Sequence, residues 1–107
     1  MELIVIAHLK VRAGKRQQFE AFERQALALI ERHGGKLLQA MRPVGAVPPA
    51  ELPDEVHVLR FPGEEALAAY RADPGLAALA GLRAEAIEST QLLIGSPLAQ
   101  WVEYYPS

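Results

Sequence analysis

Apolar residues alternate along both sides of the first segment of the chain. Ile4 and Ile6 stand on one side, and the other side carries Leu3, Val5, Ala7, Leu9 and Val11. This pattern predicts a β-strand over residues 2–11 that is buried on both faces.

Residues 14–33 change to a three- and four-residue repeat, which predicts an amphipathic helix. The apolar stripe consists of Phe19, Phe22, Ala26, Leu29, Ile30 and His33. Charged residues occupy the remaining positions, and we expect them to face water: Lys15, Arg16, Glu20, Glu23, Arg24, Glu31 and Arg32. Gly34 and Gly35 then predict the end of the helix.

Strand-like segments follow at residues 36–44 and 55–61, separated by a loop with four prolines, PVGAVPPAELPD. Pro62 predicts the end of the second of these strands, because proline has no amide proton and disfavours helix at the preceding residue. Asp73 and Pro74 predict a helix cap followed by a first helical residue, so that residues 64–86 form a bent helical pair. Its core-facing residues are Leu67 and Tyr70 in the first piece and Leu76, Leu79, Leu82 and Ala86 in the second.

A fourth strand is predicted at residues 91–94, which gives the order βαββαβ of a ferredoxin-like α+β fold. The four antiparallel strands then lie in the spatial order 4-1-3-2. Two helices cover one face of such a sheet, and the apolar second face predicts a homodimer that packs sheet on sheet. We divide the chain into a domain over residues 1–96 and a C-terminal arm, residues 97–107, that packs on the partner subunit or adds a strand.

Composition narrows the class of protein. A chain of 107 residues, 50% hydrophobic and 22% charged, indicates one globular domain. Its net charge of -2, with dispersed basic residues, argues against nucleic-acid binding. The absence of cysteine excludes disulfides, thiolate metal sites and cysteine nucleophiles. The N-terminal segment lacks the features of a signal peptide and no apolar run is long enough for a bilayer, so we expect a cytoplasmic protein without membrane contact.

Two segments carry a resemblance to known families. IAHLKVRAGKRQQFEAFERQALALIERHGGKLL resembles antibiotic-biosynthesis-monooxygenase-like members of the dimeric α/β-barrel superfamily. VHVLRFPGEEALAAYRADPGLAALAGLRAEAIESTQLLIG is similar to a small family of unknown function, on the pattern of Phe61, Pro62, Tyr70, Pro74, Leu79, Arg83 and Gly95. The resemblance implies a ferredoxin-like subunit in a dimeric α/β barrel.

Departures from these families limit what the resemblance implies about chemistry. Arg60, Gly63 and Ala69 stand where the family of unknown function usually has an acidic residue, Ser and Trp. Superfamily members that oxidise quinol-like substrates or degrade haem typically use an Asn, and this sequence contains none. An activity can therefore be expected from the superfamily, but not carried over residue by residue.

His8 and His57 are the candidate catalytic pair. The first and third strands are predicted neighbours. Aligning the midpoints of these two strands places the two imidazoles near each other. On one face they could exchange protons or bind a metal, for which no third ligand has convincing spacing. A register shift of one residue would instead put them on opposite faces as rim histidines.

Four further residues are candidates for substrate binding. Arg60 and Arg83 could hold an anion through their guanidinium forks, and a salt bridge across the dimer explains Arg60 equally well. Tyr70 could line a pocket or only pack in the core. Trp101 belongs to an aromatic tail that either docks on the partner subunit or forms a lid.

The sequence therefore predicts a small homodimer with a pocket between sheet and helices. Its function is either that of a cofactor-independent enzyme acting on a small apolar or aromatic anion, monooxygenase-like or isomerase-like, or that of a noncatalytic binding or assembly module. A pocket of about 300 Å³ or more with converging polar groups would favour a ligand.

Overall fold

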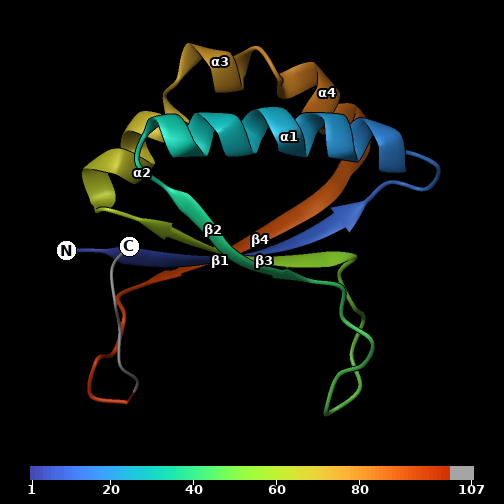
Figure 1. The fold of residues 1–107 in the computed structure, drawn as a ribbon. Helices are drawn as coiled ribbons and strands as arrows, with labels where there is room; N and C mark the ends of the chain where they lie inside the picture. Colours follow the sequence, from blue (N-terminus) through green and yellow to red (C-terminus); the bar gives the residue numbers. More distant parts are fainter. Residues whose placement is uncertain (102–107) are drawn as a thin grey trace.

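A computed structural model describes residues 1–101 and shows the predicted α+β, ferredoxin-like fold (Figure 1). Four antiparallel strands lie in the order β2-β3-β1-β4, as the sequence predicted. The elements in chain order are β1 (Leu3–Val11), α1 (Arg16–Arg32), β2 (Lys36–Met41), β3 (Glu55–Phe61), α2 (Glu64–Arg71), α3 (Pro74–Ala77), α4 (Ala80–Ala86) and β4 (Ile87–Gly95).

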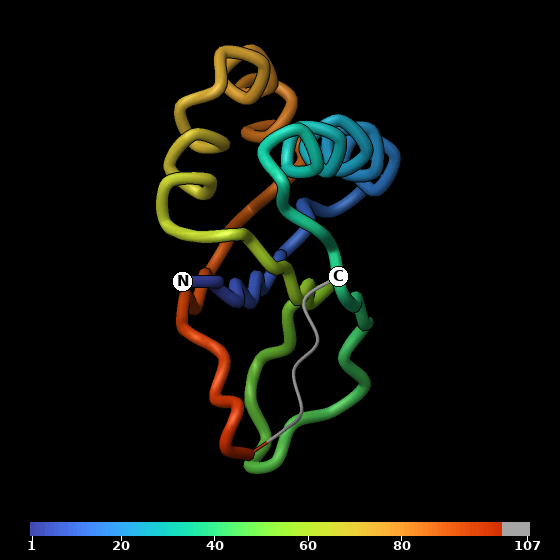
Figure 2. Tube along the Cα trace, turned by 60° about the vertical axis from the view of Figure 1, so that its left-hand side comes forward, coloured from blue at the N-terminus to red at the C-terminus, as the bar shows by residue number. Residues whose placement is uncertain are grey.

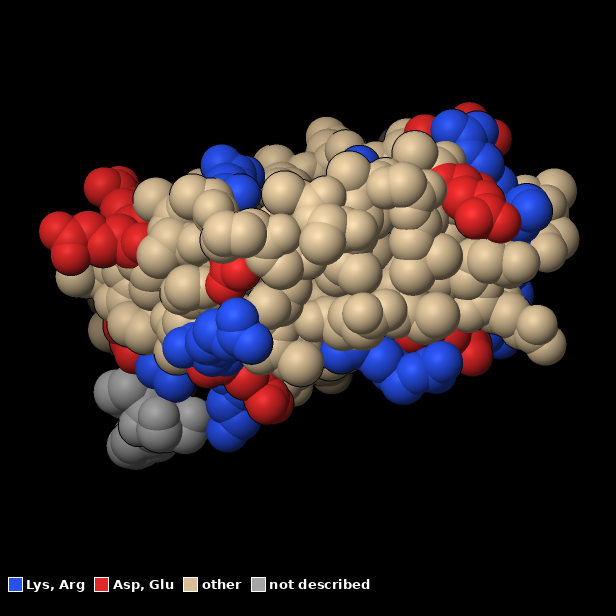
Figure 3. All heavy atoms as spheres, turned by 90° about the horizontal axis from the view of Figure 1, so that it is seen from above, with Lys and Arg blue, Asp and Glu red and all other residues tan. Residues whose placement is uncertain are grey.

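The four helices cover one face of the sheet (Figures 1 and 2). The loop between β2 and β3 and the segment after β4 extend from the opposite side. Seen from the helical side, uncharged side chains cover much of the surface and most charged groups lie toward its edges (Figure 3). The core is therefore built between the helices and one face of the sheet.

Helix α1 buries the apolar residues of the predicted stripe, whereas His33, its last member, follows the helix and is half-buried. Its buried residues are Phe19, Phe22, Ala26, Leu29 and Ile30. All of these except Leu29 belong to core clusters with buried residues of β1 and β3, among them Leu9 and Phe61. The helix ends before Gly34, whose positive φ of 81° suits glycine because it has no side chain to clash there.

The two proline positions act as predicted. Strand β3 ends at Phe61 before Pro62, and Pro74 is the first residue of α3. The Asp73 carboxylate caps α3 by accepting a hydrogen bond of 2.7 Å from the Gly75 amide. The second helical piece is divided again, since residues 78–79 separate α3 from α4.

Two strand boundaries differ from the prediction because pairing, and not local pattern, decides them. Strand β2 stops at Met41 instead of residue 44, where Met41 pairs with Val56 near the start of β3. Strand β4 begins at Ile87 instead of residue 91, because Val11 at the end of β1 offers Ile87 a partner. A strand extends only as far as its neighbour provides backbone groups to pair with.

The predicted arm is described only in part. Residues 97–101 form no strand, and Trp101 is 77% exposed. Residues 102–107 lie outside the described part of the chain, and so does the remainder of the arm prediction. No helix within residues 1–101 has the length and apolar character of a membrane span.

Candidate functional site

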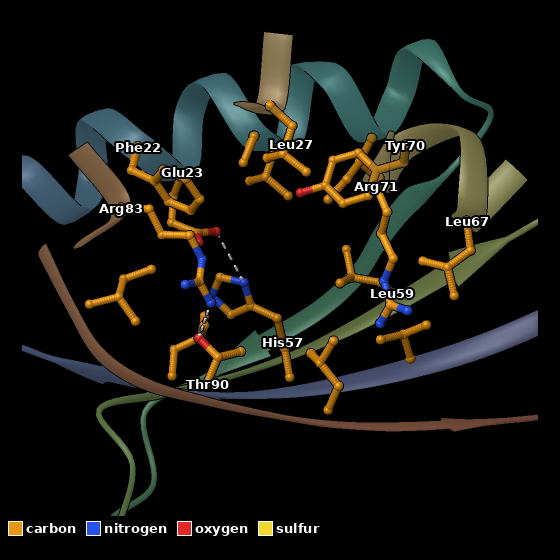
Figure 4. Close-up of a pocket in the computed structure, with 18 of the residues that line it drawn as sticks. Phe22, Glu23, Leu27, His57, Leu59, Leu67, Tyr70, Arg71, Arg83 and Thr90 are labelled. Carbon is orange, nitrogen blue, oxygen red and sulfur yellow. Dashed lines mark hydrogen bonds and ion pairs between the residues drawn. The ribbon is translucent and has the colours of Figure 1, made fainter. Parts of the chain in front are cut away.

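A cavity of about 420 Å³ lies between the helices and the sheet (Figure 4). Much of its wall is apolar and comes from β1, β3, α1 and α2, including Val5, Phe22, Leu27, Leu59 and Leu67. Its polar lining residues are Glu23, His57, Tyr70, Arg71, Arg83 and Thr90. Volume and lining are those of a site for a small molecule.

His57 lies at one end of this cavity between two carboxylates. Its Nε2 atom is 2.7 Å from Glu55 Oε1, and its Nδ1 atom is 3.4 Å from Glu23 Oε2. The residue is only 5% exposed. His57 therefore has a carboxyl group beside each of its two ring nitrogens.

The two carboxyl groups differ in their environments. Burial raises the pKa of Glu23, and the nearby Glu55 charge adds to this effect, while His57 and Arg83 oppose it. Burial alone would also raise the pKa of Glu55, but hydrogen bonds from His57 and Arg16 outweigh it and lower that pKa. Glu55 therefore remains a carboxylate that orients His57, whereas Glu23 is the group suited to exchange a proton.

Arg16 supports this arrangement from the start of α1. It forms ion pairs with Glu55 and, at 3.0 Å, with Glu20. The guanidinium also lies 5.2 Å from the ring centroid of Phe19. These contacts hold Glu55 in place, so the order of groups from surface to cavity is Arg16, Glu55, His57 and Glu23.

Arg83 and Tyr70 line the cavity. Arg83 Nη2 donates a hydrogen bond of 2.9 Å to Thr90 Oγ1. The Tyr70 ring packs 5.9 Å from that of Phe61. Burial, followed by the Glu23 charge, raises the pKa of Tyr70, so its hydroxyl stays neutral. Tyr70 thus both packs in the core and lines the cavity.

The structure separates the two histidines that the sequence paired. His8 is opposite Val56, and His57 is opposite Ala7. Since neighbouring residues of a strand point to opposite faces, His57 lies on the helical face and His8 on the other. The hypothesis of a shared face is therefore wrong, and with it a joint site of the two imidazoles.

Arg60 and Trp101 also lie away from the cavity. Arg60 is on the same face as His8 and forms an ion pair with Glu2 of its own chain. Trp101 is not among the residues that line the cavity. Of the six candidate residues, the structure brings His57, Tyr70 and Arg83 together.

Two charged residues of the cavity were not recognised in the sequence. Glu23 was expected to face water, but its side chain is only 15% exposed. It follows Phe19 by four residues and precedes Ala26 by three, a spacing that places it on the apolar stripe. Arg71 follows Leu67 by four residues and shares its face. In both cases the spacing from apolar neighbours indicates a side chain on the core-facing side of the helix, and the residue was missed because it is charged.

Residues 1–101 contain no group of three or more His, Cys, Asp or Glu side chains placed to hold a metal ion. The polar residues that the structure gathers at the cavity are suited to binding an anion and to proton exchange.

The sequence matches the family described as a domain of unknown function, DUF1330, over residues 4–96. The chain belongs to the DUF1330 family. The match covers both halves of the chain, so a single family accounts for the segments that separately resembled two groups of proteins. No curated protein matches the sequence.

Several solved structures share the fold of this DUF1330 protein. A protein of unknown function from Rhodopseudomonas palustris has a TM-score of 0.78 at 20% identity, covering 91% of this chain and 82% of that chain. A dabb family protein with a ferredoxin-like fold from Mesorhizobium loti has a TM-score of 0.68 at 15% identity, covering 91% and 97%. SnoaB, a cofactor-independent oxygenase from Streptomyces nogalater, has a TM-score of 0.67 at 14% identity, covering 91% and 93%. At such low identity these likenesses show the fold alone.

Proposed function

We propose that this DUF1330 protein binds a small apolar or aromatic anion in the cavity and exchanges a proton with it through the Glu23–His57 pair. The observation that carries the proposal is the position of His57, buried between two carboxylates at the polar end of an otherwise largely apolar cavity of about 420 Å³. A buried carboxyl group with a raised pKa beside an imidazole is a typical acid-base arrangement.

The chemistry requires only groups of this chain. The Glu23–His57 pair accepts a proton from an O–H or an activated C–H group of the ligand, while Glu55 keeps the imidazole in position. Proton removal of this kind begins an isomerisation and prepares a substrate for an oxygenase reaction. SnoaB, which has the same fold, is a cofactor-independent oxygenase, and we propose that this protein likewise acts without a cofactor.

Ligand binding can be tested with a panel of aromatic and aliphatic carboxylates, each beside its neutral amide, by ligand-observed NMR. Ala77 lines the cavity and Ala78 does not, although both are exposed. Ala77→Trp should therefore weaken binding of the carboxylates at least tenfold, whereas Ala78→Trp should leave it unchanged. Circular dichroism will show that both variants are folded. Failure of the wild-type protein to bind any of the carboxylates would contradict the proposal.

Proton exchange is tested separately, by deuterium uptake from D₂O into a bound carboxylate that carries an acidic C–H group. We expect uptake with the wild type and its loss in His57→Gln. Binding without uptake would instead identify a noncatalytic binding module.

We also propose that two copies pack through the sheet face that carries no helices. This face presents Ile4, Ile6 and Val58, together with Met41 and Leu93, which are 57% and 56% exposed in the single chain. An apolar sheet face of this kind is ordinarily shielded from water by another protein surface. Sedimentation of Leu93→Glu and Ile94→Glu tests the proposal, because adjacent residues of β4 lie on opposite faces. We expect a wild-type dimer that dissociates in Leu93→Glu and persists in Ile94→Glu; a wild-type monomer would contradict the proposal.

A further inference from the structure

The two arginines that line the cavity lie at opposite ends of it. In Figure 4 Arg83 is beside His57 and Thr90, whereas Arg71 is beside Leu59 and Leu67. The apolar side chain of Leu27 lies between the two arginines in this view. The cavity therefore has two polar ends joined by an apolar middle.

The two ends differ in charge. Arg83 donates a hydrogen bond to Thr90, and its positive charge acts to lower the pKa of Glu23. Glu55 lies behind His57 at the same end. An anion bound there would be close to two carboxyl groups. No carboxylate within residues 1–101 forms an ion pair with Arg71, so this guanidinium is available to an anion from solution.

The middle of the cavity decides the shape of the ligand. A ligand that uses both ends must carry an apolar body between its two polar groups, and Tyr70 and the leucines suit a flat or linear one. A volume of about 420 Å³ has room for one aromatic ring with a short side chain.

Building on the proposed function, we infer that the ligand is an elongated aromatic carboxylate that binds Arg71 through its carboxylate. Its opposite end, a hydroxyl or an acidic C–H group, contacts the Glu23–His57 pair. Arg71 is then the residue that selects for an anion, and Arg83 serves the acid-base end.

The test is isothermal titration of para-hydroxyphenylpropionate, its ortho isomer and the neutral para-ethylphenol. The proteins are the wild type, Arg71→Gln, Arg83→Gln and, as an exposed control on α1, Arg24→Gln. We expect Arg71→Gln to weaken binding of para-hydroxyphenylpropionate at least tenfold and to leave para-ethylphenol unchanged. Arg83→Gln should weaken binding of the carboxylate less than Arg71→Gln does, and Arg24→Gln should not change it. The ortho isomer should bind the wild type more weakly than the para isomer.

A second measurement locates the hydroxyl group. The chain has three histidines, so the NMR signals of His57 can be assigned by their loss in His57→Gln. Binding of para-hydroxyphenylpropionate should shift these signals more than binding of phenylpropionate, which has no hydroxyl group.

The outcomes separate this inference from the function on which it rests. Carboxylate binding that is lost in Arg83→Gln and kept in Arg71→Gln would overturn the orientation inferred here while leaving the proposed function intact. Equal binding of the ortho and para isomers would also overturn it. Absence of binding by all three probes to the wild type would count against the proposed function itself.

Discussion

Glu55 accepts a hydrogen bond from His57, two residues later on the same strand, over 2.7 Å. Because residues two apart in a strand point to the same face, β3 itself supplies both the imidazole and the group that orients it. Arg16 on α1 then holds Glu55 from the other side. Glu55 and His57 thus connect the surface of the protein to the acid-base end of the cavity.

We predict that Glu55→Gln destabilises the protein at neutral pH by about 1 kcal/mol, because charged hydrogen bonds are lost and solvent partly screens them. The folded-state pKa of Glu55 is lowered, so its contribution is present above the ordinary pKa and is lost as the pH falls through the folded-state pKa. Urea denaturation at several pH values should show the difference between wild type and variant shrinking with acidification. A difference that does not depend on pH would contradict the assignment.

Glu23→Gln should have the opposite effect. Burial raises the pKa of Glu23, so as the pH rises above the ordinary pKa of Glu, the unfolded chain ionises first and the wild type loses stability. The neutral amide avoids this loss, and we expect the variant to be more stable at neutral pH by on the order of 1 kcal/mol and equally stable in acid. Glu31→Gln, on the exposed side of α1, is the matched control and should show little change. Lower stability of Glu23→Gln at neutral pH would show that its ion pair with His57 outweighs burial.

The end of α1 is joined to the start of α3 by His33 and Asp73, whose Nε2 and Oδ2 atoms are 2.7 Å apart. The hydrogen bond from His33, followed by that from the Gly75 amide, lowers the pKa of Asp73. Its contribution is therefore present above the ordinary pKa of Asp and is lost as the pH falls. At neutral pH we predict denaturation midpoints in the order wild type, Asp73→Asn, Asp73→Ala, because Asn keeps the helix cap and loses only the charge. The midpoints of the wild type and Asp73→Asn should converge in acid, whereas Asp73→Ala should stay lower because it lacks the cap at every pH. An Asn variant as stable as the wild type at neutral pH would exclude a contribution from the His33 contact.

Replacement of glycine by alanine should change the free energy of unfolding in opposite directions at two positions. A Cβ atom on Gly35 would lie 2.6 Å from Ile30 Cγ2 and 3.0 Å from Phe61 Cε1, whereas one on Gly81 meets nothing within 4 Å. Gly35→Ala should lower the free energy of unfolding by about 1–3 kcal/mol through overpacking. Gly81→Ala, inside α4, should raise it by about 0.5–1 kcal/mol. Chemical denaturation of both variants tests the packing between α1 and β3. A Gly35→Ala variant with an unchanged free energy of unfolding would show that this contact is loose.

The candidate site could be predicted from the sequence only in part. Tyr70 was found through its helical spacing from Leu67, Arg83 through its guanidinium fork, and His57 through its predicted place on a strand next to that of His8. Glu23 escaped because a charged residue is ordinarily expected on the solvent side of a helix, although its spacing from Phe19 places it inside. The pairing of His8 with His57 failed since one residue of register decides which face a side chain occupies.

The sequence by itself determined the order and type of the elements, the strand order and the breaks at Pro62 and Pro74. The elements and their breaks follow from local periodicity and from the restricted backbone of proline, which act within a few residues. The strand order follows from the βαββαβ succession of a ferredoxin-like fold. Tertiary structure alone decided where β2 ends and β4 begins, which face His8 occupies, and that Glu23 and Glu55 flank His57 in the wall of the cavity. The reason is physical: register, burial and electrostatic coupling arise between segments distant in the chain, and no local pattern specifies them.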